Sequence, residues 1–258
     1  MEAVIVRTSA LPLPWMAAIV LLVTAAGTTL AVVLARLVRR DLDTVLPTPP
    51  AAFMATLFAL FVSFLASSVW EDAARARDAV EAEAAALLDA RAYLTLLPED
   101  QANRIGALLR SYVAEVAGRE WPAMSHGRDS PEADTMLVEL RLAVLALGDT
   151  STRAAAGLQR SADSIARARD QRLSVAHAVV SALKWAAVLC LGFSALFALS
   201  LATPGHVYDQ LLGLGPACVA ITVGLLVVMA TDRPFLGQVS VTPQPLLAAA
   251  ADLPGGRE

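Results

Sequence analysis

Long uncharged runs of apolar residues alternate along this chain with charged, helix-forming stretches. Four such runs lie at about residues 15–35, 51–70, 179–202 and 211–231. Each approaches the roughly 20 residues that cross about 30 Å of hydrocarbon as a helix. Because backbone amides find no water partner inside a bilayer, each run must be helical. The pattern therefore predicts an integral membrane protein with four transmembrane helices.

The stretch between the second and third runs has the pattern of a water-exposed helical domain. It carries 17 acidic residues and 13 Arg between positions 71 and 177, and no run long enough to span a bilayer. Residues 71–96 lack Gly and Pro and are rich in strong helix formers. We therefore expect the second span to continue as one helix from about 51 to 96. A last helix is expected to run unbroken from about Thr152 into the third span.

Between these two long helices the sequence predicts a helical hairpin. Its first helix follows Pro98, Pro122 and residues 125–128 mark its turn, and its second helix follows the cap residue Ser130. The predicted fold class is all-α: four transmembrane helices, and an extramembrane four-helix bundle formed by long extensions of spans 2 and 3 plus the inserted hairpin. Helical spacing places these residues in the bundle core: Leu87, Leu94, Leu109, Tyr112, Leu140, Val144 and Leu158.

Composition agrees with this plan and narrows the partners. The chain is 57% hydrophobic and 17% charged, with a net charge of -4, so no basic excess points to nucleic acid. The lipid bilayer is the expected partner. The expected divisions are 1–70 for the first two spans, 71–178 for the helical domain, 179–232 for the last two spans and 233–258 for a C-terminal tail.

Motifs for catalysis or metal binding are missing from the sequence. His126, His177 and His206 lack metal-ligand spacing, and both cysteines, Cys190 and Cys218, fall inside apolar runs. There is no phosphate-binding loop, no dinucleotide fingerprint and no nucleophile elbow. We expect no catalytic, cofactor-binding or metal-binding residues, and no enzyme.

The second span carries two contrasting ridges of side chains. The large ridge consists of Phe53, Leu57, Phe61 and Leu65, and the small ridge of Ala55, Ala59, Ser63 and Ser67. The ridges are offset by about 200° around the helix. Small ridges let helices approach closely in lipid. For the large ridge two interpretations stay open: contact with lipid or neighbouring helices, or a hydrophobic constriction in an oligomeric pore.

Charged pairs stand at two membrane boundaries. Glu71 and Asp72 follow the second span, and Asp232 and Arg233 end the fourth. Such charges are either solvated helix ends or part of a vestibule that attracts and rejects ions. Asp232 and Arg233 are also able to form a local ion pair.

Several strings along the chain are informative, and two of them, residues 120–124 and residues 232–237, are specific in combination. The strings are Glu83-Ala84-Ala85-Ala86-Leu87, Leu108-Leu109-Arg110-Ser111-Tyr112, Glu120-Trp121-Pro122-Ala123-Met124, Asp170-Gln171-Arg172-Leu173 and Asp232-Arg233-Pro234-Phe235. With them the chain resembles the bacterial DUF4239 family, also called bestrophin-like domain proteins; an Arg would be more usual at Gln171. The resemblance implies four spans around a helical domain, and the comparison with bestrophins implies a homo-oligomeric channel for anions. The alternative is a non-conducting membrane scaffold or sensor whose helical domain binds a protein partner.

The resemblance also bears on location and orientation. It implies the bacterial inner membrane. When only short loops are counted, one side of the membrane has three positive charges, Arg36, Arg39 and Arg40. The side of the termini has two, Arg7 and Arg233. Arginines of the domain near the membrane reverse that count. We therefore expect the termini and the helical domain in the cytoplasm.

Overall fold

The structure is a computed structural model that describes residues 11–40, 49–124, 127–147, 152–178, 180–203, 205, 207–236 and 240–254. Within these ranges the chain is helical and contains no strand. The helices are α2 (Leu13–Arg40), α3 (Pro49–Leu94), α4 (Glu99–Glu115), the π-helical turn η1 (Val116–Glu120), α5 (Trp121–Met124), α6 (Pro131–Leu145), α7 (Thr152–His177), α8 (Ala182–Ala202), α9 (Val207–Thr231) and α10 (Gln244–Ala251).

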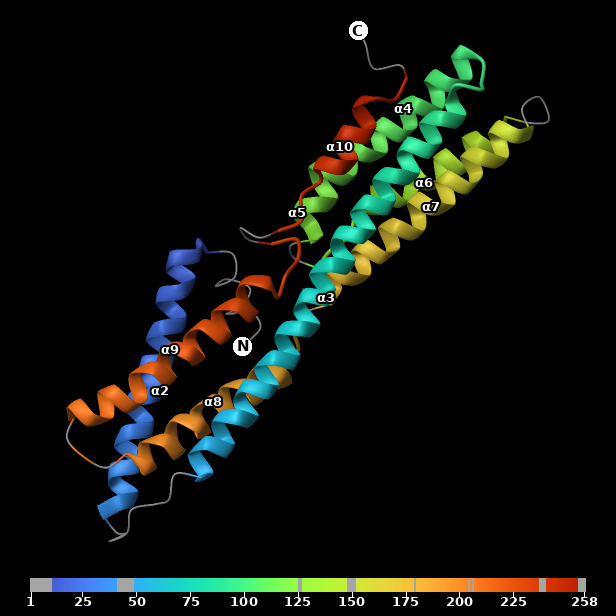
Figure 1. The fold of residues 1–258 in the computed structure, drawn as a ribbon. Helices are drawn as coiled ribbons and strands as arrows, with labels where there is room; N and C mark the ends of the chain where they lie inside the picture. The colour runs from blue at the N-terminus through green and yellow to red at the C-terminus, as the bar shows by residue number, and fades with distance from the viewer. Residues whose placement is uncertain are drawn as a thin grey trace. The chain divides into compact units, whose positions relative to one another are not determined.

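The described residues form two compact units. Unit 1 holds residues up to Glu71 and 180–232, and unit 2 holds 72–178 together with 233–236 and 240–254. The helix α3 passes from one unit into the other without a break (Figure 1). The prediction of one long helix through the second span is thus confirmed.

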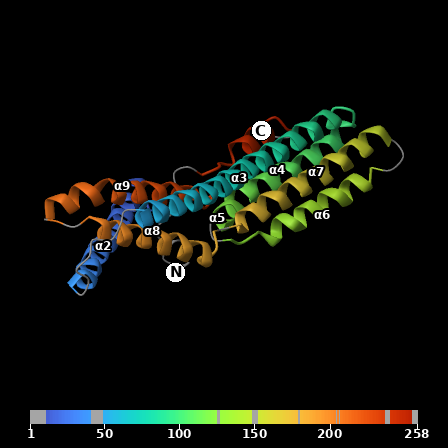
Figure 2. The same ribbon diagram turned by 60° about the horizontal axis from the view of Figure 1, so that its bottom comes forward.

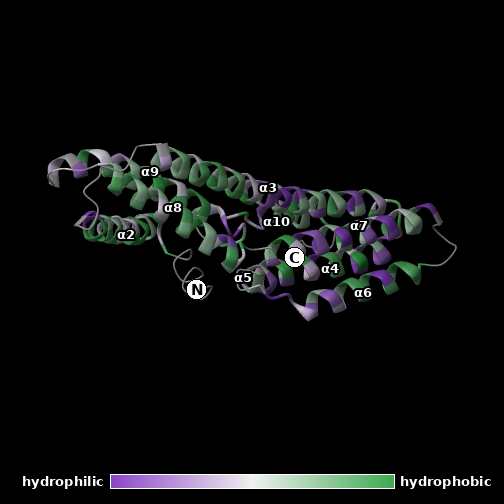
Figure 3. Ribbon diagram, turned by 90° about the horizontal axis from the view of Figure 1, so that it is seen from below, coloured by the Kyte–Doolittle hydropathy of each residue, from purple (hydrophilic) through white to green (hydrophobic). Residues whose placement is uncertain are grey.

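Unit 1 contains the four helices that are long and apolar enough to cross a membrane: α2, the first part of α3, α8 and α9. Figure 3 shows them as mostly hydrophobic along their length. The all-α fold with four candidate spans is therefore confirmed. Thr24 of α2 and Thr222 of α9 share a hydrogen bond of 2.6 Å between their hydroxyl oxygens. Such bonds between buried hydroxyls help to hold helices together where lipid provides no hydrophobic driving force.

The prediction of an unbroken helix from Thr152 into the third span is wrong. The helix α7 ends at His177, and α8 begins at Ala182. Ser181 caps the new helix, because its hydroxyl accepts a hydrogen bond from the backbone N–H of Lys184. The backbone N–H of Val180 donates to Asp232 at 2.9 Å instead of to the preceding helical turn. These two side chains satisfy backbone donors that a continuous helix would have paired internally.

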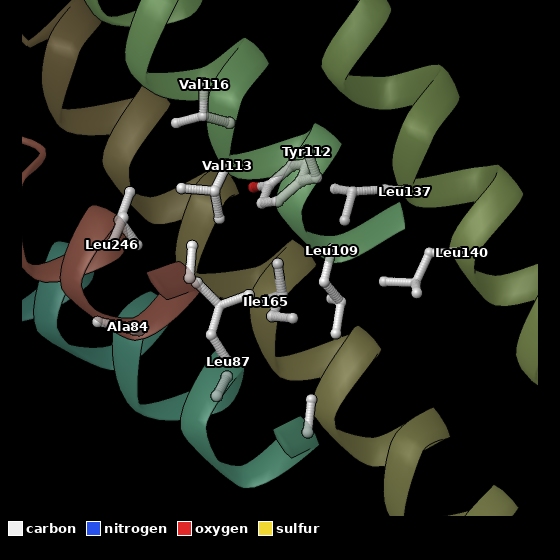
Figure 4. Packing of buried hydrophobic residues seen from close by; sticks show 14 of the residues in the cluster. Ala84, Leu87, Leu109, Tyr112, Val113, Val116, Leu137, Leu140, Ile165 and Leu246 are labelled. Carbon is white, nitrogen blue, oxygen red and sulfur yellow. The ribbon is translucent and has the colours of Figure 1, made fainter. Parts of the chain in front are cut away.

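Unit 2 packs around one apolar core. Side chains of α3, α4, α6 and α7, which run side by side in Figure 2, meet in it. The core residues predicted from helical spacing, namely Leu87, Leu94, Leu109, Tyr112, Leu140, Val144 and Leu158, are all buried. Figure 4 shows Leu109 and Tyr112 of α4, Leu137 of α6 and Ile165 of α7 gathered in this core.

A π-helical turn adjusts the face that the first hairpin helix presents to this core. Tyr112, Val116, Glu120 and Met124 are buried at every fourth residue. Over these 12 residues a regular helix would drift by roughly 120°. The π turn accommodates one extra residue and brings Glu120 and Met124 back to the buried side. The helix continues through Pro122 to Met124, so it ends later than the sequence suggested.

The C-terminal segment also joins this core, although the sequence pattern predicted only a tail. The helix α10 buries Leu246 and Ala249 against unit 2 (Figure 4). Trp121 donates its indole N–H to the carbonyl of Val241, and its ring meets that of Phe235 edge to face. The segment is therefore part of the folded unit rather than a free tail.

Candidate pore helix and buried charge network

The large ridge of the second span is not uniformly placed. Phe53 is 61% exposed, Leu57 and Phe61 are half-buried, and Leu65 is 5% exposed within the core of unit 1. The ridge steps by four residues, whereas a helix turns every 3.6, so its members drift around α3. Leu65 consequently contacts the protomer's own helices, while Phe53 points outward.

Two further large residues lie on the exposed side of α3. Leu60 is 51% exposed and Phe64 is 68% exposed. Together with Phe53, and with Leu57 and Phe61 at its edge, they form an apolar surface that we call the outer face of α3. Spacings of three and four, rather than four alone, identify this face in the sequence. The ridge assignment missed Leu60 and Phe64 because it followed the four-residue spacing only.

The small ridge lines a cleft within unit 1. Ala55, Ala59, Ser63 and Ser67 are all exposed. The first three border a cleft of about 580 Å³, whose other walls come from α8 and α9. The cleft has no charged residue in its lining. Small side chains on α3 thus leave room for an additional apolar element beside it.

The boundary charges have different surroundings. Glu71 is exposed, and Asp72 pairs with Arg75 one helical turn away. Asp232 is 4% exposed and accepts the hydrogen bond from Val180 described above. Asp232 therefore helps to fix the start of the third span, whereas Glu71 is available to solvent or ions. Arg233 is half-buried in unit 2.

The feature that sequence reasoning missed is a network of buried charges in unit 2. Arg172 donates to Glu83 at 2.8 Å and to Glu120 at 2.8 Å, and all three side chains are fully buried. Arg169 donates to the other oxygen of Glu120 at 3.0 Å and also pairs with Asp134. Two cations and two carboxylates are thereby balanced inside the core, with Asp134 at the rim.

Neutral groups complete the network. The hydroxyl of Tyr112 donates to Glu83 at 2.6 Å. The carbonyl of Ser130 accepts from Arg169 at 3.0 Å, and the guanidinium of Arg172 lies 5.1 Å from the centre of the Trp121 ring. The network joins α3, α4, η1 and α7 with the turn that precedes α6. Buried charges of this kind fix one packing arrangement when every member has its partners.

The electrostatics of this network favour its charged form. Burial alone would lower the pKa of Arg172, but the nearby Glu83 carboxylate raises it above its usual value. Burial likewise opposes the charge of Arg169, and its hydrogen bonds to Glu120 raise the pKa. The pKa of Tyr112 is raised well above 10, first by burial and then by the Glu83 carboxylate. The guanidinium groups therefore stay charged, and the phenol keeps its proton.

Four residues of this network lie in strings that carry the family resemblance. Glu83, Tyr112, Glu120 and Arg172 each belong to one of these strings. The strings by themselves do not show that these residues meet in one core. Among the described residues no group of three or more His, Cys, Asp or Glu is placed to hold a metal ion. His126 and His206 lie outside the described residues, and His177 bonds the carbonyl of Gly127 at 3.0 Å.

Comparison with solved structures identifies the fold. Two variants of a bacterial bestrophin homologue from Klebsiella pneumoniae align with TM-scores of 0.72 and 0.70. They share 13% and 14% sequence identity with this chain, covering 93% and 92% of it and 98% of their own length. A third structure, described as a membrane protein, aligns with a TM-score of 0.69 and 13% sequence identity. The alignment covers 91% of this chain and 96% of that structure's chain. No curated protein matches the chain.

A family model agrees with these structural matches and covers most of the chain. The Bestrophin-like domain matches residues 17–246, from within the first candidate span to the start of α10. The chain therefore belongs to the Bestrophin-like domain family.

Proposed function

We propose that this protein is a homo-oligomeric ion channel in which α3 of each copy lines the ion path. The observation that carries the proposal is the membership of the chain in the Bestrophin-like domain family over residues 17–246, because the resemblance to bestrophins implies a channel. The outer face of α3 supports it. Phe53, Leu60 and Phe64 are more than half exposed on a helix that continues into the helical unit.

In this proposal the outer faces of several copies meet around a common axis. A ring of Phe and Leu side chains makes a narrow, dry passage, because ions that enter it must give up water without gaining polar partners. Phe53, Leu57, Phe61 and Phe64 form successive rings along the passage. Leu65 takes no part, because it is buried in the protomer's own core.

The wider part of the path is proposed to begin where α3 leaves the apolar region. Glu71 is exposed there, one residue beyond the last apolar position of the span. A ring of such carboxylates changes the local concentration of ions of each sign. We assign Glu71 a role in ion selectivity on this ground, and Asp72, paired with Arg75, a structural one.

Placement of the protein in the cell belongs to the same proposal. On the basis of the sequence strings, we propose that the chain belongs to the DUF4239 group within its family and lies in the bacterial inner membrane. We propose that the helical unit and both termini lie in the cytoplasm, on the basis of the near-membrane arginines.

Electrical recording of the purified protein in planar bilayers tests the channel. Wild-type protein is expected to conduct, and Phe64→Ala, which removes a large side chain from the proposed passage, is expected to raise the conductance. Leu22→Ala is the matched control, because Leu22 is 71% exposed on α2. If neither wild-type nor Phe64→Ala protein carries a current of chloride or of monovalent cations, the channel function is ruled out.

A second function has one observation in its favour. Val138, Leu142 and Leu145 are 52%, 61% and 68% exposed and lie along one side of α6. An apolar stripe on a water-exposed helix is typical of a protein-binding surface. In a non-conducting scaffold, this stripe would hold the partner. Silent bilayers, combined with loss of the domain's cross-links to a partner in the Leu142→Glu variant, would favour the scaffold over the channel.

A further inference from the structure

A second cleft in unit 1 has a charged side chain at one end. It lies between α2 and α9, has a volume of about 550 Å³, and is separate from the cleft beside α3. Ala25, Val32, Leu214 and Cys218 are among its lining residues, and Arg36 lies at its end. From Ala25 to Arg36 the helix rises roughly 16 Å, about half of a hydrocarbon core of about 30 Å. The cleft thus has the depth of one leaflet.

The walls of the cleft are apolar although two threonines lie on them. Thr28 donates its hydroxyl to the carbonyl of Thr24, and Thr29 donates to that of Ala25. Both hydroxyl hydrogens are therefore used inside α2 rather than offered to the cleft. An occupant of this space must be a hydrocarbon over most of its length.

Arg36 is held at the end of the cleft by a neutral partner. Its guanidinium donates to the side-chain oxygen of Gln210 at 2.7 Å, and Gln210 is 6% exposed. Among the side chains that the structure describes, no carboxylate forms an ion pair with Arg36. Arg39, in contrast, donates to the backbone carbonyls of Ser200 and Leu201 at the end of α8. Gln210 thus positions the guanidinium of Arg36, which can donate hydrogen bonds to an anionic partner.

We propose that this cleft binds an anionic phospholipid, with one acyl chain between α2 and α9 and the headgroup phosphate at Arg36. The combination of a hydrocarbon-lined space of one leaflet's depth and a guanidinium at its polar end matches this class of ligand. Basic groups between transmembrane helices recognise anionic headgroups in the same way. The hydrocarbon walls contribute little preference over bulk lipid, so the selectivity resides in Arg36. The proposal is independent of ion conduction.

Cys218 provides a direct readout, because it lines the cleft and is partly accessible. In a Cys190→Ser background it is the remaining cysteine of the chain. We would measure the rate of its alkylation by N-ethylmaleimide in detergent micelles doped with phosphatidylglycerol or phosphatidylcholine. Phosphatidylglycerol is expected to slow the reaction about fivefold more than phosphatidylcholine, the scale of one basic side chain at an anionic surface.

Matched variants assign this protection to the headgroup contact. Arg36→Gln should abolish the difference between the two lipids, and Arg36→Lys should keep most of it. Arg75→Gln removes an exposed arginine from unit 2 and should leave the difference unchanged. In the reverse background, Cys218→Ser, the alkylation of exposed Cys190 should not depend on the headgroup.

Four results would overturn the proposal. Equal rates in the two lipids, or slowing that persists in Arg36→Gln, would show that the cleft does not select anionic lipid. Protection by inorganic phosphate alone would identify an ion site instead. Protection that follows oligomerisation and ignores the lipid would show that a second copy of the chain fills the cleft.

Discussion

Arg172 and Glu83 lie 89 residues apart in the chain, yet the guanidinium Nε of Arg172 donates to Glu83 at 2.8 Å, with both side chains fully buried. Glu83 belongs to the helix that also forms the second span, and Arg172 belongs to α7. The pair therefore fixes how the continuation of α3 packs in the helical unit. Replacing both partners of such a buried ion pair by apolar residues costs little stability. Replacing only one partner is strongly destabilising, because the other charge stays buried without compensation.

Removing Arg172 alone should be strongly destabilising. Arg172→Met leaves Glu83 and Glu120 buried with fewer compensating charges, so we expect a loss of about 3–5 kcal/mol in the free energy of unfolding. Denaturant unfolding of the full chain in detergent measures it. Arg75→Met is the matched control, because Arg75 is 65% exposed in its pair with Asp72, and it should cost less than about 1 kcal/mol. Equal losses in the two variants would contradict the network's role.

Tyr112 should make the helical unit sensitive to alkaline pH. Its pKa is raised in the folded state by burial and by Glu83. In the unfolded chain a tyrosine loses its proton near pH 10, so from about that pH upward the unfolded state is favoured and stability falls. Melting temperatures between about pH 8 and 11 should therefore fall less steeply for Tyr112→Phe than for the wild type. Parallel curves for the two proteins would exclude this linkage.

Gly106 should be needed for the C-terminal segment to pack against α4. A Cβ on Gly106 would lie 2.6 Å from the carbonyl oxygen of Pro254, whereas one on Gly118 would meet nothing within 4 Å. Gly106→Ala should therefore cost about 1–3 kcal/mol. Gly118→Ala should be neutral or stabilise the protein by up to about 1 kcal/mol, because it restricts the unfolded chain. Limited proteolysis of the C-terminal segment should accelerate in the first variant only.

The apolar part of the fold was predictable from periodicity. Leu109 and Leu140 recur at helical spacing, and this spacing suffices to place them in a core. The network was not predictable, because Glu83 and Arg172 look like ordinary solvated helix residues until two distant helices bring them together. The break before α8 also escaped notice, since Asp232, a distant residue, satisfies the backbone of Val180.

The exposed side chains of the second span were predictable only in part. The sequence identified α3 as having a bulky side and a small side. It did not show which residues of the bulky side the protomer covers, because that depends on how α8 and α9 pack. Phe58 and Leu65 are covered, and Phe64 is not. The outer face is thus a product of tertiary packing.

Orientation is open to a labelling experiment in intact cells. Asp129 is an exposed residue in the hairpin turn, and Tyr208 is 81% exposed at the start of α9. With the helical unit in the cytoplasm, Asp129→Cys should escape a membrane-impermeant thiol reagent, and Tyr208→Cys should react with it. Neither position is a glycine with positive φ, in contrast to Gly127 and Gly205, where a new side chain would be strained.

The background for this labelling must lack Cys190 and Cys218. Cells permeabilised before labelling provide the control, since both new cysteines should then react. Reaction at Asp129→Cys in intact cells, with none at Tyr208→Cys, would place the helical unit on the outside and reverse the proposed topology.

The cleft beside α3 makes a prediction about assembly. Ala59 borders a space of about 580 Å³ that the protomer leaves unfilled between α3, α8 and α9. If a helix of the neighbouring copy packs there, small side chains are needed for close approach. Ala59→Leu should then convert the oligomer to smaller species, as measured by light scattering or native mass spectrometry. Ala18→Leu adds the same bulk to an exposed position on α2 and should leave the oligomer intact.

The same variant separates assembly from conduction. Phe64→Ala changes the outer face of α3 and should alter conductance without changing the mass of the oligomer. Ala59→Leu should change the mass and, by dispersing the protomers, abolish conductance as well. An Ala59→Leu protein with wild-type mass would show that the cleft faces lipid, so that contacts elsewhere, such as the apolar stripe on α6, hold the copies together.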